Sequence, residues 1–336
     1  MLTYKNLVRP IMFSLSPELA HSLGELLMSF EFPWKLVGPH YKPKDSRLRT
    51  TLAGIELTNP LGVAAGCDKN CKFLASLLHL GFGYVVGGTV TLNPRTGNPK
   101  PRIIRNPSKQ SLTNSLGFPS MGSVRVSKNI KNSSANPLIL SVSGMTIEEF
   151  VSCFRKMEPL ADGTELNISS PNSAGLKVFH ETKTFRALLE EINGVRTKPV
   201  FVKIPPYFDS RGQQEVLQLV KLSKQLGIDG ITATNTKPVE DPCLKMGRGG
   251  LSGSPLYNDM LDIVSDVRDE AGKGMFINAC GGISKPEDAI EAIQKGANTV
   301  QIYTGLIYEG PGIAKAINRG LSKYLDLHKL DSVDSI

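Results

Sequence analysis

The chain has 336 residues, 40% of them hydrophobic, and its 39 Lys and Arg against 31 Asp and Glu give a net charge of +8. A chain of this length can bury one large core, so we expect a single principal domain. Nucleic-acid binding is disfavoured, because the sequence has one Trp and no long basic run, whereas an anionic membrane surface, substrate or cofactor fits the positive charge.

The cysteines indicate the redox compartment of the protein, and the hydropathy indicates whether the chain crosses a membrane. The five cysteines are odd in number and scattered, which favours a reducing compartment without disulfides. Cys67 and Cys71 have no second pair at metal-ligand spacing, so we interpret them as packing residues and expect no metal. Because no apolar run reaches the ~18 residues of a transmembrane helix, we predict that the chain does not span a bilayer.

The first segment, residues 4–32, predicts two short helices. Pro10 must kink or delay the first, and Ser16-Pro17 supplies an N-cap and a first-turn proline for the second. The second helix carries a broad apolar stripe made of Leu19, Leu23, Leu26, Leu27 and Phe30. Helices this apolar, placed before the first expected barrel strand, are either a lid packed on the rest of the chain or a surface that dips into lipid.

From residue 61 onward, short apolar runs alternate with helical patterns eight times. Strands are expected at 61–65, 84–89, 138–142, 165–168, 200–204, 230–234, 275–279 and 299–303. Helices are expected at 70–80, 123–129, 146–157, 181–192, 213–225, 256–270, 285–295 and 312–324, and the third opens with a capping box at Thr146 and Glu149. This α/β pattern predicts a (β/α)8 TIM barrel over 46–336 with an N-terminal two-helix extension over 1–45.

In a TIM barrel the active site lies at the carboxyl ends of the strands, and polar groups follow each expected strand here. They are Lys69, Thr89, the Ser141–Gly144 turn, the loop 165–177, Lys203, Thr234-Asn235-Thr236, Cys280-Gly281-Gly282 and Tyr303-Thr304-Gly305. Glycines follow strands seven and eight, and Gly249–Gly253 is a further glycine-rich loop. Such loops close backbone N–H groups around a phosphate, which favours a phosphate-bearing cofactor.

The loop 165–177 has the highest density of hydrogen-bonding groups. Its carboxamides, Asn167 and Asn172, suit a flat ligand with alternating carbonyl and N–H groups, such as a pyrimidine. Pro171 restricts the backbone of Ser170 and so fixes the direction of its hydroxyl. The alternative is an ordinary strand-to-helix turn with capping Ser and Asn residues.

These motifs closely resemble those of the dihydroorotate dehydrogenases, in order and over nearly the whole chain. The matching segments are 59–69, 97–102, 114–118, 167–177, 202–203, 234–236, 249–253, 281–282 and 301–304. In that family the residue before the loop proline is the catalytic base, so the resemblance implies Ser170 in this role. A Ser at this position marks the quinone-using, membrane-associated class two, whereas a Cys marks the soluble class one.

The resemblance also implies the ligands, for an oxidation of dihydroorotate to orotate in pyrimidine synthesis. FMN would be held by Ala65, Lys69, Thr89, Asn167, Lys203, Thr234, Ser252, Gly253, Gly281, Gly282, Tyr303 and Thr304. The substrate would be held by Lys69, Asn114, Ser115, Leu116, Gly117, Phe118, Asn167, Asn172, Asn235 and Thr236. His21 and Arg105 would line a quinone tunnel between the N-terminal helices, which implies a peripheral location on the cytoplasmic side of the cell membrane.

Several departures keep alternatives open. The segments 114–117, 141–145 and 203–209 look more like class one. Ser143 or Val142 stands where class two has a flavin-contacting Asn, and Gly87 or Gly88 stands where class two often has an acidic residue. One alternative is a soluble cytoplasmic enzyme that uses fumarate or a protein partner. Another is a phosphate-binding lyase or isomerase with Lys203 as a Schiff-base nucleophile. A purely binding role is disfavoured by the Lys, Asn and Ser residues at so many strand ends.

Overall fold

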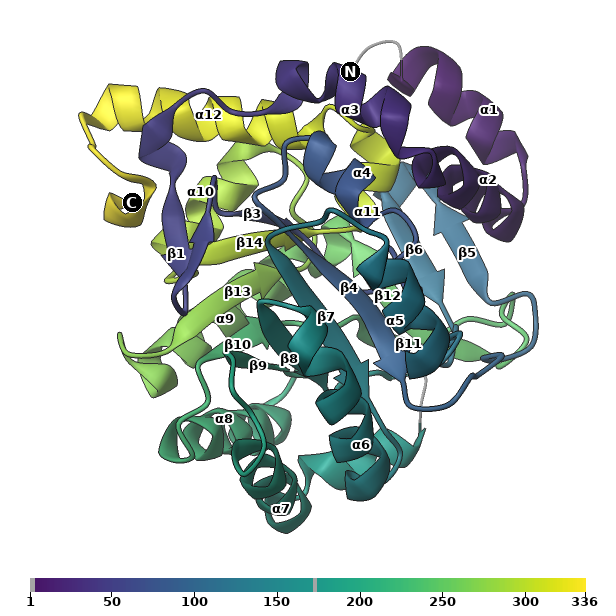
Figure 1. Cartoon of the computed structure of the whole chain (residues 1–336), viewed down its shortest axis with the longest axis vertical. Helices are drawn as coiled ribbons and strands as arrows, with labels where there is room; N and C mark the ends of the chain where they lie inside the picture. The colour runs from purple at the N-terminus through teal and green to yellow at the C-terminus, as the bar shows by residue number, and fades with distance from the viewer. Residues whose placement is uncertain (1–3, 172–173) are drawn as a thin grey trace.

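The computed structural model describes residues 4–171 and 174–336 and contains a closed barrel of parallel strands in the order β10-β13-β14-β3-β4-β7-β8-β9 (Figure 1). The strands are β3 (Leu61–Val63), β4 (Tyr84–Thr91), β7 (Leu138–Ser143), β8 (Gly163–Asn167), β9 (Val200–Lys203), β10 (Gly230–Ala233), β13 (Phe276–Cys280) and β14 (Thr299–Ile302). All eight expected strands are present. The predicted TIM barrel is therefore confirmed.

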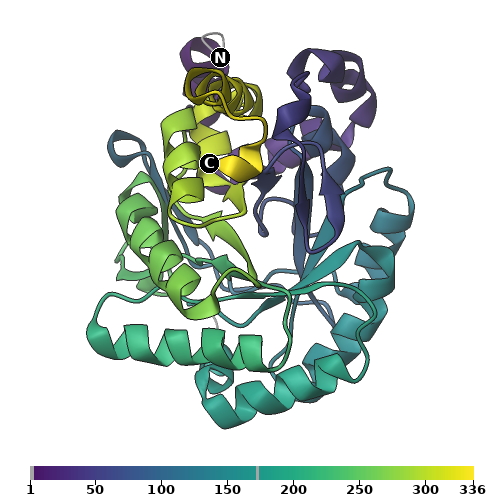
Figure 2. The ribbon, with the colours of Figure 1, turned by 90° about the vertical axis from the view of Figure 1, so that its left-hand side faces the viewer.

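The expected helices wrap around the outside of the strands (Figure 2). They are α4 (Leu74–His79), α5 (Ser123–Lys131), α6 (Ile147–Met157), α7 (Thr182–Asn193), α8 (Ser210–Gln225), α9 (Tyr257–Ala271), α10 (Pro286–Gln294) and α12 (Ile313–His328). Helix α4 begins four residues later than predicted, because the Asp68 carboxylate accepts the N–H groups of Lys72 and Phe73 and holds a turn there.

The capping box predicted for α6 is present in its first half. The Thr146 hydroxyl accepts the N–H of Glu149 at 3.1 Å. The Glu149 carboxylate, however, accepts the N–H of Met145 at 2.9 Å, one residue before the expected donor. The helix start is therefore stabilised by two hydrogen bonds, but they are not the reciprocal pair that the sequence pattern suggested.

Two β elements outside the barrel were not predicted. The hairpin of β1 (Thr50–Leu52) and β2 (Ile55–Leu57) packs Leu52 and Leu57 against the barrel residues Tyr84 and Phe201. A second, four-stranded sheet has the order β11-β12-β6-β5, with β11 (Lys237–Glu240), β12 (Arg248–Gly253), β6 (Ser111–Asn114) and β5 (Ile103–Asn106). Its strands come from two long loops that are far apart in the sequence, and they wall one side of the cavity described below.

The N-terminal segment forms a π-helical turn (Tyr4–Val8), α1 (Arg9–Ser14), α2 (Pro17–Ser29) and a third helix, α3 (Glu31–Tyr41), that was not expected. Pro10 lies in the first turn of α1 and so starts that helix without kinking it. Helix α2 lies beside β5 (Figure 1), and Glu18 holds it there through Lys100 at 2.8 Å and Arg102 at 3.6 Å.

The outer surface of this segment is apolar. Large exposed side chains occur on all of its helices, namely Leu7, Val8, Ile11, Leu19, Leu23, Leu26, Leu27, Phe30, Phe32, Leu36 and Val37. No helix in the described part of the chain is both long and apolar enough to cross a bilayer. The boundary that we predicted between residues 45 and 46 stays a prediction.

Candidate active site

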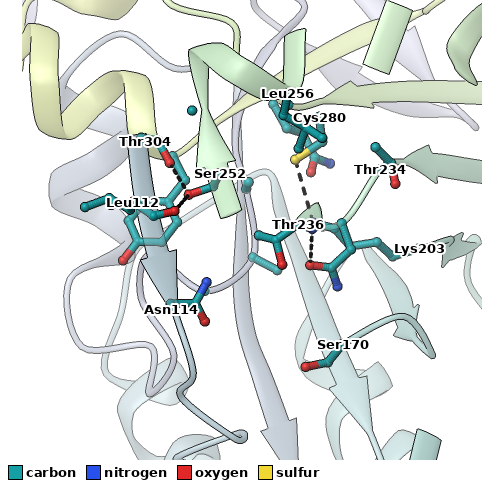
Figure 3. Close-up of a pocket in the computed structure, with 18 of the residues that line it drawn as sticks. Leu112, Asn114, Ser170, Lys203, Thr234, Thr236, Ser252, Leu256, Cys280 and Thr304 are labelled. Carbon is teal, nitrogen blue, oxygen red and sulfur yellow. Dashed lines mark hydrogen bonds between the residues drawn. The ribbon is translucent and has the colours of Figure 1, made fainter. Parts of the chain in front are cut away.

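A cavity opens at the carboxyl ends of the barrel strands, where β12 and β6 of the outer sheet also reach it (Figure 3). All twelve residues predicted to hold a cofactor line this cavity: Ala65, Lys69, Thr89, Asn167, Lys203, Thr234, Ser252, Gly253, Gly281, Gly282, Tyr303 and Thr304. They come from seven different strand ends and from the outer sheet. The fold therefore brings together residues that are up to 239 positions apart in the sequence (304 minus 65).

A network of buried carboxamides and hydroxyls lies at the ends of β4, β8 and β10. The Asn167 side chain donates to the Thr89 hydroxyl at 2.8 Å, and its oxygen accepts from the Ser169 hydroxyl at 3.2 Å. Asn235 donates to the Ser169 hydroxyl at 2.9 Å. These bonds fix the orientation of both carboxamides, which is what a site for a flat polar ligand requires.

Lys203 projects from the end of β9 and is 4% exposed. Its Nζ has one hydrogen-bond partner in the described part of the chain, the Cys280 Sγ at 3.7 Å (Figure 3). Burial alone would lower the pKa of this ammonium, but the nearby Cys280 and Glu165 raise it above its usual range. Lys203 is therefore a buried cation that has no acidic side chain bound to it.

Lys69 lies on the other side of the cavity, in the loop after β3. Its Nζ donates to the Gly66 carbonyl at 2.6 Å. Burial, which disfavours the charged form, lowers the pKa of the ammonium to about 8. An anionic ligand beside Lys69 would stabilise the charged form, so this side chain suits a carboxylate.

The outer sheet and β14 place hydroxyl groups on a third side. Thr304 donates to the Ser252 hydroxyl at 2.9 Å, and Ser252 donates to the Leu112 carbonyl at 3.2 Å (Figure 3). Gly253 has φ +96° and Gly282 has φ +74°, a region that strains any residue with a Cβ. These two glycines let the backbone turn at the cavity wall.

Eight of the ten residues predicted to contact a substrate line the same cavity. Asn114, Leu116, Gly117, Phe118, Ser170, Asn235 and Thr236 line it together with Lys69 and Asn167. Ser115 is 1% exposed, lies outside the lining, and accepts a hydrogen bond from Asn98 at 3.4 Å, so it supports the loop from behind. Asn172 lies outside the described residues.

Three further serines hold neighbouring groups in place. Ser169 is 3% exposed and bonded to two carboxamides, so it orients Asn167 and Asn235. Ser143 donates to the Asn167 carbonyl at 2.9 Å and lies outside the cavity lining, as Val142 does. Ser141, which also lies outside the lining, contacts the Thr89 hydroxyl at 3.0 Å.

A second cavity of about 600 Å³ lies between the barrel and the N-terminal helices, and its lining is mostly apolar. Both residues predicted for a tunnel, His21 and Arg105, line it. Arg105 stacks over the Phe13 ring at 4.7 Å and donates to the carbonyls of Met12 and Leu15, so it also anchors the end of α1. Cys67, which we expected to be a packing residue, is a buried core side chain that also lines this second cavity.

The two cavities share three wall residues, Ile103, Leu112 and Tyr303. Ile103 and Leu112 belong to the unpredicted outer sheet, and Tyr303 follows β14. The cavity at the strand ends and the apolar cavity beneath the helices thus adjoin at these three residues. A small electron carrier in one would lie close to a ligand in the other.

His21 gives a prediction on stability. Burial, together with the Lys69 charge, lowers the pKa of His21 to about 4 from an unfolded value near 6.5. Between those two values the unfolded chain binds the proton and the folded chain does not, so stability falls as pH falls from about 6.5 to about 4. We expect His21→Gln to flatten the dependence of the free energy of unfolding on pH across this window, measured by urea titration. The exposed His328→Gln serves as the control and should keep the parent slope.

Several lining residues were missed as functional candidates. Cys280 and Gln301 lie within motifs that the sequence analysis quoted, but only the strand register shows that their side chains point inward. Ile103 and Leu112 carry no signal of their own, because their role depends on the outer sheet.

The comparisons with known proteins agree with this geometry. The family model for dihydroorotate dehydrogenase matches residues 47–325. The dihydroorotate dehydrogenase (quinone) of Allorhizobium ampelinum is 33% identical over 350 residues, covering 98% of this chain and 94% of that protein. The protein of the same name from Roseiflexus sp. is 34% identical over 340 residues, covering 95% and 93%.

Two solved structures are similar over nearly their whole length. The ligand-free DHODH of Eimeria tenella has a TM-score of 0.84 at 27% identity and covers 95% of this chain and 98% of its own. The complex of that protein with ferulenol has a TM-score of 0.82 at 26% identity, with 97% of each chain covered. The chain therefore belongs to the dihydroorotate dehydrogenase family, and within it to class two.

Proposed function

We propose that the protein oxidises dihydroorotate to orotate with bound FMN and passes the electrons to a quinone, in pyrimidine synthesis. The observation that carries this proposal is the pair of adjoining cavities, one polar and one apolar, with Ile103, Leu112 and Tyr303 as their common wall. A polar substrate and a lipophilic acceptor need two such compartments. The names of the curated relatives, which include quinone, support the same assignment.

The residues of the polar cavity fit FMN. Lys203 offers a buried cation that has no acidic side chain bound to it, the Asn167 and Thr89 pair offers oriented donors and acceptors, and Ser252 and Thr304 offer hydroxyls beside Gly253. When bound, FMN accepts a hydride from the substrate and delivers electrons to a second acceptor. Lys203 is the residue suited to the pyrimidine edge of the flavin, because a cation there compensates the charge gained on reduction.

The remaining groups suit the substrate. Asn167 and Asn235 present fixed carboxamides to the ring, and Lys69 lies where it can pair with the substrate carboxylate. Ser170 takes a proton from the ring carbon next to the one that loses hydride. A Ser hydroxyl is a weak base at neutral pH, so water must relay this proton.

The electron acceptor enters through the N-terminal segment. The cavity lined by His21 and Arg105 lies beneath helices whose outer side chains are apolar, which suits uptake of a quinone from lipid. We assign residues 1–45 to quinone and membrane contact and 46–336 to FMN and substrate. The location that follows is peripheral, on the cytoplasmic side of the membrane.

The alternatives are less well supported. A Schiff-base nucleophile must lose its proton, whereas the surroundings of Lys203 raise the pKa of its ammonium. The soluble alternative leaves the apolar cavity and the exposed side chains of α2 and α3 without a role.

Cofactor content and acceptor choice test the proposal. We expect purified protein to be yellow, to release one FMN per chain on denaturation, and to reduce a ubiquinone or menaquinone analogue faster than fumarate or NAD when given dihydroorotate. Colourless protein that does not take up added FMN would rule out the flavin, and a preference for fumarate would assign the chain to the soluble alternative.

A further inference from the structure

Glu165 is an acidic side chain inside the barrel that has no role in the proposed reaction. Glu165 lies on β8 two residues before Asn167, so both side chains point into the barrel. It is 1% exposed, and neither of its carboxylate oxygens has a hydrogen-bond partner among the described residues. A buried carboxylate without hydrogen bonds is unfavourable unless a charge nearby compensates it.

Lys203 is the side chain that can compensate it. The strand register pairs Asn167 with Lys203 and Glu165 with Phe201. The Lys203 side chain therefore extends from the neighbouring strand two residues further along than the level of Glu165. The groups whose pKa values respond to Glu165 are Lys203, Cys280 and Tyr84. Burial raises the pKa of both the Cys280 thiol and the Tyr84 hydroxyl, so these two groups are neutral near pH 7. Within this group, Lys203 is the one cationic side chain.

We propose that Glu165 is a positioning residue that acts through Lys203. Glu165 keeps the Lys203 side chain as an ammonium and offsets part of the positive field of that ammonium at the flavin. This inference rests on the proposed FMN site. Without Glu165 the full charge of Lys203 would stabilise the reduced cofactor. With Glu165 the flavin is less strongly oxidising, so its electrons pass more readily to the quinone.

The test is the reduction potential of bound FMN in Glu165→Gln, which keeps the shape of the side chain and removes its charge. We expect the potential to move to a more positive value. Equivalently, the ratio of the dissociation constants of oxidised and reduced FMN should rise by about tenfold or more, because at an effective dielectric constant of about 20 the loss of one charge gives a tenfold change at roughly 12 Å and a larger change at shorter distances. Reduction of the flavin by dihydroorotate should persist, whereas its reoxidation by a quinone analogue should slow.

Three further variants separate this role from a structural one. Thr164→Val removes a neighbouring buried hydroxyl that also has no hydrogen-bond partner in the described part of the chain but lies on the opposite face of β8, and it should leave the potential unchanged. Glu165→Asp keeps the charge and should stay near the parent value, which also covers the possibility that the Gln variant folds poorly. In the Lys203→Met background, at saturating FMN, Glu165→Gln should have a smaller effect.

Distinct outcomes would overturn the inference. An unchanged potential in Glu165→Gln, an equal shift in Glu165→Asp, or a full shift in the absence of Lys203 would each show that Glu165 does not act through that cation. Failure of the proposed function looks different, because the parent protein would then bind no FMN, and both proposals would fall together.

Discussion

Replacing Ser170 with Ala is expected to slow the reduction of bound FMN by dihydroorotate by roughly 10²- to 10⁴-fold, the usual contribution of a positioned general base. Ser170 lines the same cavity as Thr236 and Asn235, the residues proposed to hold the substrate. The groups assigned to FMN, such as Lys203 and Ser252, come from other strand ends. The cofactor should therefore remain bound with parent stoichiometry while the chemical step is lost.

Single-turnover bleaching of the flavin, followed by stopped flow under anaerobic conditions, measures this step directly. Ser170→Cys should retain partial activity with a pH optimum moved upward, because a thiol must lose a proton near its ordinary pKa of about 8.5 to act as a base. Reduction of the Ser170→Ala flavin at near the parent rate would show that Ser170 is not the base.

Ser169→Ala is the matched control on the adjacent residue. Ser169 bonds both Asn167 and Asn235, so its loss should loosen the carboxamides and weaken the binding of orotate. Its hydroxyl is buried, however, so the rate at saturating dihydroorotate should fall much less than in Ser170→Ala. We therefore expect Ser169→Ala to affect mainly the binding of orotate and Ser170→Ala to affect mainly the chemical step.

The barrel and the polar half of the site were predictable because both depend on local pattern. Lys203 follows Phe201 and Val202 at the end of an apolar run, and a Lys there must point either into the barrel mouth or into solvent. The topology of a TIM barrel then collects the strand ends into one place. Twelve residues expected to hold a cofactor could therefore be predicted to lie together, and all twelve line one cavity.

What could not be predicted depends on long-range pairing. Leu112 and Ser252 are neighbours because β6 pairs with β12, across 140 residues, and nothing in either loop alone indicates that pairing. Helix α3 was not predicted. It contains two prolines, Pro33 in its first turn, where proline is tolerated, and Pro39 inside the helix. The charge environment of Lys203 also required the register of β8 against β9.

The N-terminal helices should serve only the acceptor half of the reaction, and Gly24 offers a way to test this without deleting them. Gly24 lies on α2 and lines the apolar cavity. A Cβ built at this position has no heavy atom within 4 Å, so a larger side chain has room to enter the cavity. Gly24→Phe should therefore occupy the space meant for a quinone without straining the helix.

We expect Gly24→Phe to lower quinone-dependent turnover by about 10- to 200-fold, the range over which steric misfit discriminates between ligands. Reduction of FMN by dihydroorotate should stay near the parent rate, because this cavity meets the polar one only at Ile103, Leu112 and Tyr303. Ser22→Phe, at an exposed position of the same helix, is the control and should leave both half-reactions intact.

Deletion of residues 1–32 tests the same role of the N-terminal helices, but less specifically. It removes α1 and α2 and the exposed leucines, so binding to liposomes should be lost together with quinone turnover. It also uncovers Phe73 and Leu77 on the barrel side of the cavity, so the truncated protein is expected to be less soluble. For this reason Gly24→Phe is the stronger test. If it turns over quinone at the parent rate, the cavity beneath α2 is not the acceptor site, and the helices serve only as a lid over the barrel.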